Sequence, residues 1–362
     1  MTRRWVVVAC IAVLLLLVVP VSADWLDGWD ARKSHVINNT GDALSDYQIK
    51  LIVHRSDGSD SGDDVYIGSS GCESDYDDIR FTKSDGTTFL DYWIEESDSS
   101  DATIWVEVDT IAASGNTTIY LYYGNAGASA VSSGDDTFLF FDNVANAIGT
   151  EYGTVGGTWT TEDDGGHTVR KRTNGGASVF GSDNTAGACT SDDIDDAFIV
   201  HSQVKQTDSG SVSWTGIMFR FVDSTHRYFA AIQNDGYCYL FEGGSIQIGS
   251  YYGGYDNNAF HEMMISVNGT AIKVYMDGTL RIDVSDNSFS TGKLGLLCYA
   301  DGGAEVSNKY YNTFVRKYAA TEPTHGAWGS EEKLSCTQTI IGKYNVGEFV
   351  SQQIVGKYNV NI

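Results

Sequence analysis

The stretch 265–284, ISVNGTAIKVYMDGTLRIDV, decides the fold of the larger part of the chain. Apolar and polar residues alternate around two turn dipeptides, Asn268-Gly269 and Asp277-Gly278. Both dipeptides tolerate the positive φ angles of a type I′ turn, so the stretch predicts three consecutive antiparallel strands. Similar short runs fill most of the chain, which has 40 Gly, only two Pro and almost no helical period. The sequence therefore predicts an all-β protein.

A small, polar segment divides the chain into two predicted domains. Residues 125–136, NAGASAVSSGDD, have the composition of a linker, so we place a boundary near residue 135. We expect a β-sandwich over residues 24–134. Its stretch YQIKLIV predicts four inward side chains, Tyr47, Ile49, Leu51 and Val53. Residues 135–333 hold about a dozen short strand-like runs, which favour a two-sheet jelly-roll sandwich.

The first 23 residues have the pattern of a secretory signal peptide. Arg3 and Arg4 precede a long apolar run that ends in Val-Ser-Ala, which predicts cleavage after Ala23. An uncleaved membrane anchor is the alternative, because the run is nearly long enough to span a bilayer. Either case predicts an extracellular or cell-surface protein.

The chain is strongly acidic. It has 23 basic and 48 acidic residues, a formal charge of −25 that becomes −27 when Arg3 and Arg4 leave with the signal peptide. Such a field repels phosphate backbones, so we expect no nucleic-acid partner. It is compatible with solubility in salt, with divalent cations or with a cationic partner.

Five cysteines follow the predicted cleavage site: Cys72, Cys189, Cys238, Cys298 and Cys336. No two have the close spacing of a zinc site, and five thiols allow one or two disulfides with a free thiol. Cys238 and Cys298 lie in apolar runs, where a buried thiol and a bridge are both compatible with the sequence. The pairing stays open.

The C-terminal segment 334–362 contains a short repeat. IGKYNV at 341–346 returns as VGKYNV at 355–360, a period of 14 residues. Two copies are fewer than a solenoid needs to bury a shared core. The repeat predicts a terminal β-hairpin, the start of a stalk, or an edge that self-associates with a neighbouring chain.

The first predicted domain resembles domain of unknown function 2341 (DUF2341). The resemblance rests on WLDGWDARKSHVINN at 25–39, DIRF at 78–81, LDYWIEE at 90–96, IWVEV at 104–108 and IYLYYGN at 119–125. It covers residues 24 to about 128 and implies a secreted or surface protein, without implying a reaction.

The second predicted domain is similar to concanavalin A-like lectin and glucanase sandwiches. The similarity rests on GIMFRFVDSTHRYFAAI at 216–232, VNGTAIKVYMDGTL at 267–280, STGKLGLLCY at 290–299 and FVRKYAATEPTHGAWGSEE at 314–332. It implies a sheet that contacts glycans in many members, sometimes with a structural calcium. The same superfamily contains adhesion domains and glycosidases, so the fold alone does not choose among them.

The first of these motifs places Arg220 between Phe219 and Phe221. Strand alternation predicts that both Phe rings face the core, so Arg220 would lie on the second face of its sheet. Aromatic rings suit the C–H face of a sugar, and Arg can bind its hydroxyls. Our predicted ligand-binding residues are Arg220, Trp214, Tyr228 and Tyr239. Ordinary sheet packing is the alternative.

Catalytic and metal-binding signatures are weak. Residues 137–333 lack the Glu-x-Asp-x-Glu pattern that would set two acids on one strand face, so we expect no enzyme activity. The lectin resemblance directs attention to calcium at Asp192, Asp193 and Asp195, for which a solvated loop is the alternative.

Together these observations predict a secreted or cell-surface, non-catalytic protein that binds glycans or surface polysaccharide, as an adhesion protein would. The alternatives are a structural assembly protein of a cell envelope, sheath or virion, and a glycoside hydrolase with non-standard acids.

Overall fold

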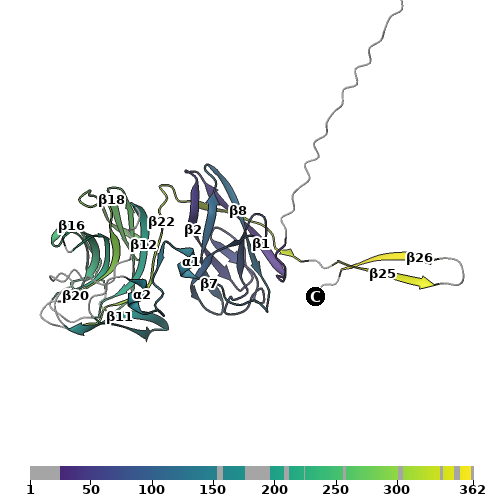
Figure 1. Ribbon diagram of the computed structural model, residues 1–362, viewed down its shortest axis with the longest axis horizontal. Coiled ribbons are helices and arrows are strands. Elements are labelled where there is room, and N and C mark those ends of the chain that lie inside the picture. The colour runs from purple at the N-terminus through teal and green to yellow at the C-terminus, as the bar shows by residue number, and fades with distance from the viewer. Residues whose placement is uncertain are drawn as a thin grey trace, which may run out of the picture.

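The computed structural model describes residues 25–152, 158–175, 196–207, 212–223, 225–255, 258–300, 305–334, 337–345 and 351–359. Two β-sandwiches lie side by side, with helix α1 (Gly134–Thr137) and strand β22 (Lys309–Lys317) near their junction (Figure 1). Within these ranges the helices are short, α1 and α2 (Ile148–Glu151) having four residues each. The predicted all-β class is confirmed.

The first domain is a sandwich of two sheets. Its chain-order strands are β1 (Ala31–Asn39), β2 (Leu44–His54), β3 (Asp64–Tyr66), β4 (Arg80–Lys83), β5 (Phe89–Leu90), β6 (Tyr92–Ser97), β7 (Asp101–Ile111) and β8 (Gly115–Tyr123). One sheet has the order β3-β2-β7-β6, and the other includes β1-β8-β4-β5. The four predicted inward side chains of β2, Tyr47, Ile49, Leu51 and Val53, are all buried between these sheets.

The second domain is a larger sandwich. Its nine-stranded sheet has the order β10-β11-β22-β12-β17-β18-β19, with β9 beside β22 and β21 beside β11. Its five-stranded sheet has the order β16-β15-β14-β13-β20. The bounds are β9 (Phe140–Phe141), β10 (Thr158–Asp164), β11 (His167–Gly175), β12 (Ala197–Lys205), β13 (Ser213–Phe221), β14 (Tyr228–Gln233), β15 (Tyr237–Glu242), β16 (Ile246–Tyr252), β17 (His261–Asn268), β18 (Ala271–Met276), β19 (Thr279–Ser285), β20 (Lys293–Ala300) and β21 (Glu305–Val306).

The predicted three-strand meander is present as β17-β18-β19. Asp277 and Gly278 both have positive φ angles, 51° and 70°, as a type I′ turn requires. The first turn differs from the prediction by one residue. Asn268 pairs with Ala271, so Gly269-Thr270 forms the loop, and Gly269 supplies its positive φ of 55°. A two-residue turn with a single positive φ angle requires glycine only at that position. Gly269 meets this requirement, so Asn268 remains in strand β17.

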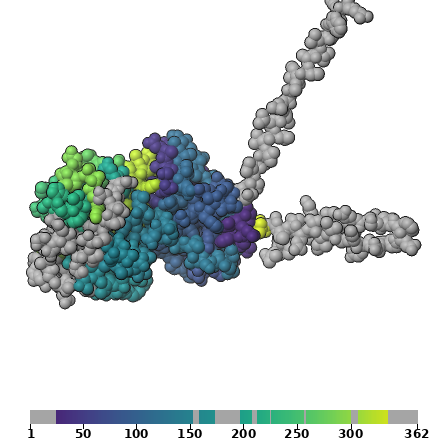
Figure 2. Space-filling view, in the orientation of Figure 1, coloured from purple at the N-terminus to yellow at the C-terminus, as the bar shows by residue number. Residues whose placement is uncertain are grey.

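The chain returns to the first domain after it completes the second. Strands β23 (Thr324–Trp328) and β24 (Glu332–Lys333) both pair with β1. In Figure 2 a yellow-green segment lies between the two domains, and the last coloured part of the chain, in yellow, lies beside the purple segment of the first domain. The predicted extent of the jelly roll to residue 333 is therefore wrong. Alternating strand pattern shows that a segment is a strand, but it does not show which sheet edge the strand covers.

Aromatic side chains join the two domains. Trp93 and Trp105, from β6 and β7, pack with Phe138, which follows α1, and with Phe314 of β22. The Phe138 and Phe314 rings stack with centroids 4.3 Å apart. This cluster is separate from the two sandwich cores and fixes one domain against the other.

The C-terminal repeat forms a hairpin of β25 (Thr337–Asn345) and β26 (Ser351–Asn359). Among the described strands, these two pair only with each other. The predicted signal peptide, residues 1–23, lies outside the described residues, as do Cys189 and Cys336. Cys72 and Cys238 are buried free thiols, and Cys298 is buried beside the Tyr310 hydroxyl. No helix in the described ranges has the length and apolar character needed to cross a membrane.

Candidate functional site

Aromatic side chains gather on the outer face of the five-stranded sheet, where Phe229 and Phe241 are buried and contact Trp214. We call the four that are not buried the aromatic face: Trp214 of β13, Tyr237 and Tyr239 of β15, and Tyr252 of β16. Strand alternation places them together, since the intervening Cys238 and Leu240 point into the core and are fully buried. Tyr237 lies directly opposite Tyr252 in the sheet register.

The rings of the aromatic face form a continuous row. Trp214 and Tyr239 lie nearly parallel, with centroids 5.9 Å apart and an interplanar angle of 11°. Tyr239 stacks on Tyr237 at 5.4 Å, and Tyr237 contacts Tyr252 at 5.0 Å. Trp214, Tyr237 and Tyr239 are half-buried, and Tyr252 is 61% exposed. Ring faces and edges are thus presented on the surface of a rigid sheet.

Small residues allow this row to form across an intervening strand. Strand β14 separates β13 from β15, and its Ala231 lies opposite both Gly216 and Tyr239. Ala231 is buried beneath the rings. A large side chain at this position would stand between Trp214 and Tyr239, because side chains on one sheet face compete for the same space.

Polar groups lie at the edge of the aromatic face. The Tyr239 hydroxyl donates a 2.8 Å hydrogen bond to Oδ2 of Asp235, and Nε2 of Gln233 donates to the same oxygen at 2.9 Å. Burial, with the bond to Asp235, raises the pKa of Tyr239 to about 12, so its phenol stays protonated. Rings beside a carboxylate and an amide are the combination that sugar hydroxyls and C–H faces require.

Sequence reasoning did not select Gln233 and Asp235. The signal available was the turn sequence QNDG at 233–236, which lies between two predicted strands. A turn of this kind positions its polar side chains beside the ends of the strands that it joins.

Arg220 does not lie on the exposed face where strand alternation placed it. It is buried, and its guanidinium donates to the carbonyls of Phe289, Asp196 and Gly269 at 3.0, 3.1 and 2.7 Å. It also pairs with the Asp196 carboxylate at 3.0 Å. The predicted exposure is wrong because the β13–β20 register shifts between Met218 and Phe221, and Arg220 adopts a φ of 48°. Such a bulge redirects the side chain.

Tyr228 lies on the opposite face from Trp214 and Tyr239. It is fully buried, and its ring stacks on Phe219 with centroids 5.4 Å apart. Its hydroxyl donates to the Asp286 carboxylate and accepts from the Phe289 amide. Of the four predicted ligand-binding residues, the fold brings Trp214 and Tyr239 together and turns Tyr228 and Arg220 inward.

The predicted calcium ligands Asp192, Asp193 and Asp195 lie outside the described residues. Among the residues that the structure does describe, no cluster of three or more His, Cys, Asp or Glu side chains is arranged to hold a metal ion.

Comparison with solved structures finds β-sandwich proteins. A carbohydrate-binding module from Bacillus subtilis is 23% identical with a TM-score of 0.35, and the alignment covers 45% of this chain and 94% of that one. The GH43 protein of Bacillus licheniformis is 12% identical with a TM-score of 0.41, covering 61% of this chain and 48% of that one. Sheep galectin-11 is 9% identical with a TM-score of 0.26, covering 36% and 97%.

At the level of sequence, no curated protein matches the chain. The predicted resemblance to DUF2341 is confirmed over part of its extent, since residues 75–162 match the model of that domain of unknown function. The matched segment begins shortly before β4 and continues through α1 into β10.

Proposed function

We propose that the protein is an exported, non-catalytic carbohydrate-binding protein that holds glycan chains on its aromatic face. The observation that carries this proposal is the parallel stacking of Trp214 and Tyr239, continued by Tyr237 and Tyr252. A row of neighbouring rings held on a sheet can contact successive sugar rings with little loss of side-chain freedom. Asp235 and Gln233 then supply polar groups for the hydroxyls.

Export is proposed from the N-terminal sequence. Residues 1–23 have the charged, apolar and small-residue regions of a signal peptide, and a mature charge of −27 suits a surface protein in a salt-containing medium. The partner would be a neutral or weakly charged polysaccharide, because the field of the protein repels polyanions.

The proposed absence of catalysis rests on the composition of this site. Among the described residues that we place at the aromatic face, Asp235 is the sole carboxylate, and two hydrogen bonds already occupy one of its oxygens. Hydrolysis of a glycosidic bond ordinarily needs two carboxyl groups on either side of that bond. Release of reducing sugar from any polysaccharide that the protein binds would contradict this part of the proposal.

The test uses the mature chain, residues 24–362, in affinity electrophoresis through gels that contain individual neutral polysaccharides. Retardation by at least one of them is expected, and calorimetry then gives its affinity. Tyr239→Ala and Tyr252→Ala should each weaken binding about tenfold or more, equivalent to about 1.4 kcal/mol. Tyr252 is mostly exposed, so its variant should fold normally.

Phe89→Ala is the matched control, because Phe89 is an aromatic residue of the first domain with 53% exposure. Its affinity should equal that of the unmodified protein. Equal affinities for all three variants and the unmodified chain would remove the aromatic face from the proposal.

An assembly role is the second candidate, and the β25–β26 hairpin favours it. Within the described sheets this hairpin pairs with neither sandwich, so its outer strand edges can pair with another chain. Light scattering of residues 24–362 and 24–334 distinguishes the two cases. A larger molar mass that the shorter chain loses would support assembly, and monomers in both would leave carbohydrate binding as the function.

A further inference from the structure

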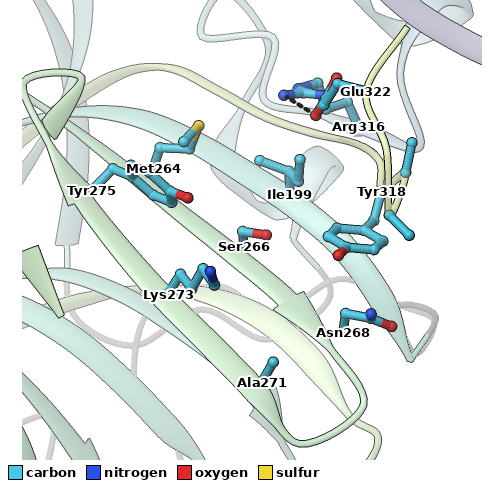
Figure 3. Close-up of a pocket in the computed structure, with 12 residues that line it drawn as sticks. Ile199, Met264, Ser266, Asn268, Ala271, Lys273, Tyr275, Arg316, Tyr318 and Glu322 are labelled. Carbon is cyan, nitrogen blue, oxygen red and sulfur yellow. Dashed lines mark hydrogen bonds and ion pairs between the residues drawn. The ribbon is translucent and has the colours of Figure 1, made fainter. Parts of the chain in front are cut away.

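A hollow opens on the outer face of the nine-stranded sheet, where the first domain meets the second. It consists of two adjoining cavities of about 330 and 250 Å³ that share Met264, Arg316 and Glu322, and we call the pair the junction groove. Figure 3 shows the smaller cavity, with Ser266 between the rings of Tyr275 and Tyr318 in this view. None of these residues belongs to the aromatic face.

Strand alternation builds the floor of the groove. Glu262, Met264 and Ser266 of β17 face outward, while the intervening Met263 and Ile265 are fully buried in the sandwich core. On β18, Lys273 and Tyr275 line the groove in the same way. The floor therefore belongs to the rigid sheet, and its side chains have fixed positions.

The first domain supplies the opposite wall of the larger cavity. Trp105 of β7 donates a 2.9 Å hydrogen bond from Nε1 to Oε2 of Glu95, which holds that carboxyl at the cavity. Burial raises the pKa of the Glu95 carboxyl above its ordinary value, while the hydrogen bond from Trp105 acts in the opposite direction. Pro323 adds apolar surface.

A chain of hydrogen bonds fixes the polar groups of the second domain. Arg316 donates from Nε to Nε2 of His201 at 3.2 Å, so Nδ1 of His201 carries the hydrogen that faces Glu262. That nitrogen lies 3.5 Å from Oε1 of Glu262, and the contact lowers the pKa of Glu262. Arg316 also pairs with Glu322 at 3.1 Å. Glu262 is thus held as an ionised acceptor.

Lys50 provides a cation without a partner of its own. It lines the larger cavity, is exposed, and makes no hydrogen bond or ion pair with any residue in the described ranges. It lines the same cavity as Glu95, His201 and Glu262. A free ammonium between acceptor side chains can donate to a ligand without first breaking an ion pair.

We propose that the junction groove is a second saccharide site, which binds one or two pyranose rings of an uncharged glycan. Hydroxyl groups can donate to Glu262 and accept from Lys50, while the half-buried Tyr275 and Tyr318 supply ring surfaces for C–H faces. Acidic and basic side chains are nearly balanced in the groove, which favours a neutral ligand over an ionic one. The combined volume lies within the usual range for small-molecule sites.

Two consequences follow from the position of the groove. Its walls come from both domains, so binding needs their observed arrangement. The groove and the aromatic face lie on the outer faces of different sheets, so one molecule can hold two glycan chains at once and cross-link them.

The experiment uses residues 24–362 and saturation-transfer NMR with a panel of methyl pyranosides and neutral trisaccharides. Transfer to at least one saccharide is expected, and the Tyr239→Ala variant should retain it. In the Tyr239→Ala background, which weakens binding at the aromatic face, Glu262→Gln and Lys50→Ala should each weaken the remaining binding about tenfold or more, because each removes a charge-assisted hydrogen bond. Lys50 is exposed, so its variant tests the site without disturbing the fold. Lys333→Ala, a 73% exposed lysine side chain far from the groove, is the control.

Each result either supports or overturns the junction groove as a saccharide site. Loss of transfer in both groove variants, with normal transfer in Lys333→Ala, supports the site. Absence of transfer to every saccharide, or transfer that both groove variants preserve, overturns it. Transfer lost in Tyr239→Ala alone would assign all binding to the aromatic face. Transfer lost in the groove variants alone, with polysaccharide affinity unchanged in Tyr239→Ala, would retain the groove and reject the aromatic face.

Discussion

Arg220 and Gly269 join the two sheets of the second sandwich. Nη2 of Arg220, on β13 of the five-stranded sheet, donates a 2.7 Å hydrogen bond to the carbonyl of Gly269, in the β17–β18 turn of the nine-stranded sheet. The backbone of the bulge that carries Arg220 lies so close to Gly292 that a Cβ there would be 2.5 Å from the Arg220 carbonyl carbon. Arg220, a charged residue in an apolar run, therefore has a structural role: its hydrogen bonds connect the two sheets.

Arg220→Ala should destabilise the protein. The change leaves three buried or part-buried carbonyls without their donor, and we expect the free energy of unfolding to fall by about 2–5 kcal/mol. Urea denaturation followed by tryptophan fluorescence measures this. Arg281→Ala, which removes one hydrogen bond to Tyr251, is the control and should cost about 1 kcal/mol. An equal decrease in the free energy of unfolding for the two variants would contradict this structural role of Arg220.

Asp142→Ala should be among the most damaging substitutions in the second domain. The Asp142 carboxylate accepts from the Arg170 guanidinium at 2.6 and 2.7 Å and from the Tyr152 hydroxyl at 3.0 Å, and all three side chains are buried. Its removal leaves the Arg170 charge unpaired inside the protein, at a cost of about 3–5 kcal/mol.

The exposed pair of Lys273 and Asp283, 3.4 Å apart, supplies the control for that measurement. Asp283→Ala should change the unfolding free energy by less than about 1 kcal/mol. A small effect of Asp142→Ala in the same denaturation series would show that water reaches the Arg170 site.

A fragment of residues 24–134 should fold poorly by itself. It lacks β23, which covers the β1 edge, and Ala319, which is buried in the core of the first domain. An open strand edge promotes aggregation. We expect a synthetic peptide of residues 319–334 to raise the melting temperature of the fragment, whereas a scrambled peptide should not. Cooperative melting of the isolated fragment at the temperature of the full chain would disprove the dependence on β23.

His35 should make the fold sensitive to acid. It is fully buried, its ring stacks on Trp328 at 4.0 Å, and Nε2 lies 2.9 Å from Nδ1 of His325. Burial, with the charge of His325, lowers the pKa of His35 to about 3. The unfolded chain therefore binds more protons than the folded one below about pH 6.5. The stability contributed by neutral His35 is present above that pH and is lost as the pH falls towards 3.

Comparison with His35→Phe isolates this effect. Between pH 6.5 and pH 5 the unmodified protein should lose about 1.6 kcal/mol more than the variant, because the loss approaches roughly 1.4 kcal/mol for each pH unit only below the unfolded pKa. The variant is necessary because His54, between Asp64 and Asp101, has a raised pKa and gains stability in acid. Parallel urea-midpoint curves for the two proteins would exclude His35 as the titrating group.

The sequence determined the β class, the meander and the inward residues of β2, because these depend on side-chain alternation and on turn residues that are close in the chain. It also selected Trp214 and Tyr239, whose residue types suit a sugar face. It placed Arg220 on the surface because alternation has no signal for a bulge, and it treated Tyr228 as exposed because either face of a strand accepts Tyr.

Only the tertiary structure decided three further relationships. Ala231 lets the Trp214 and Tyr239 rings meet across β14, β23 returns to the edge of β1, and Lys50 and Glu262 line one cavity at the domain junction. Each joins residues that are distant in the chain or separated by a strand. Local pattern fixes the faces of a strand, whereas strand order and domain packing fix which faces meet. The aromatic face and the junction groove therefore depend on strand order and domain packing.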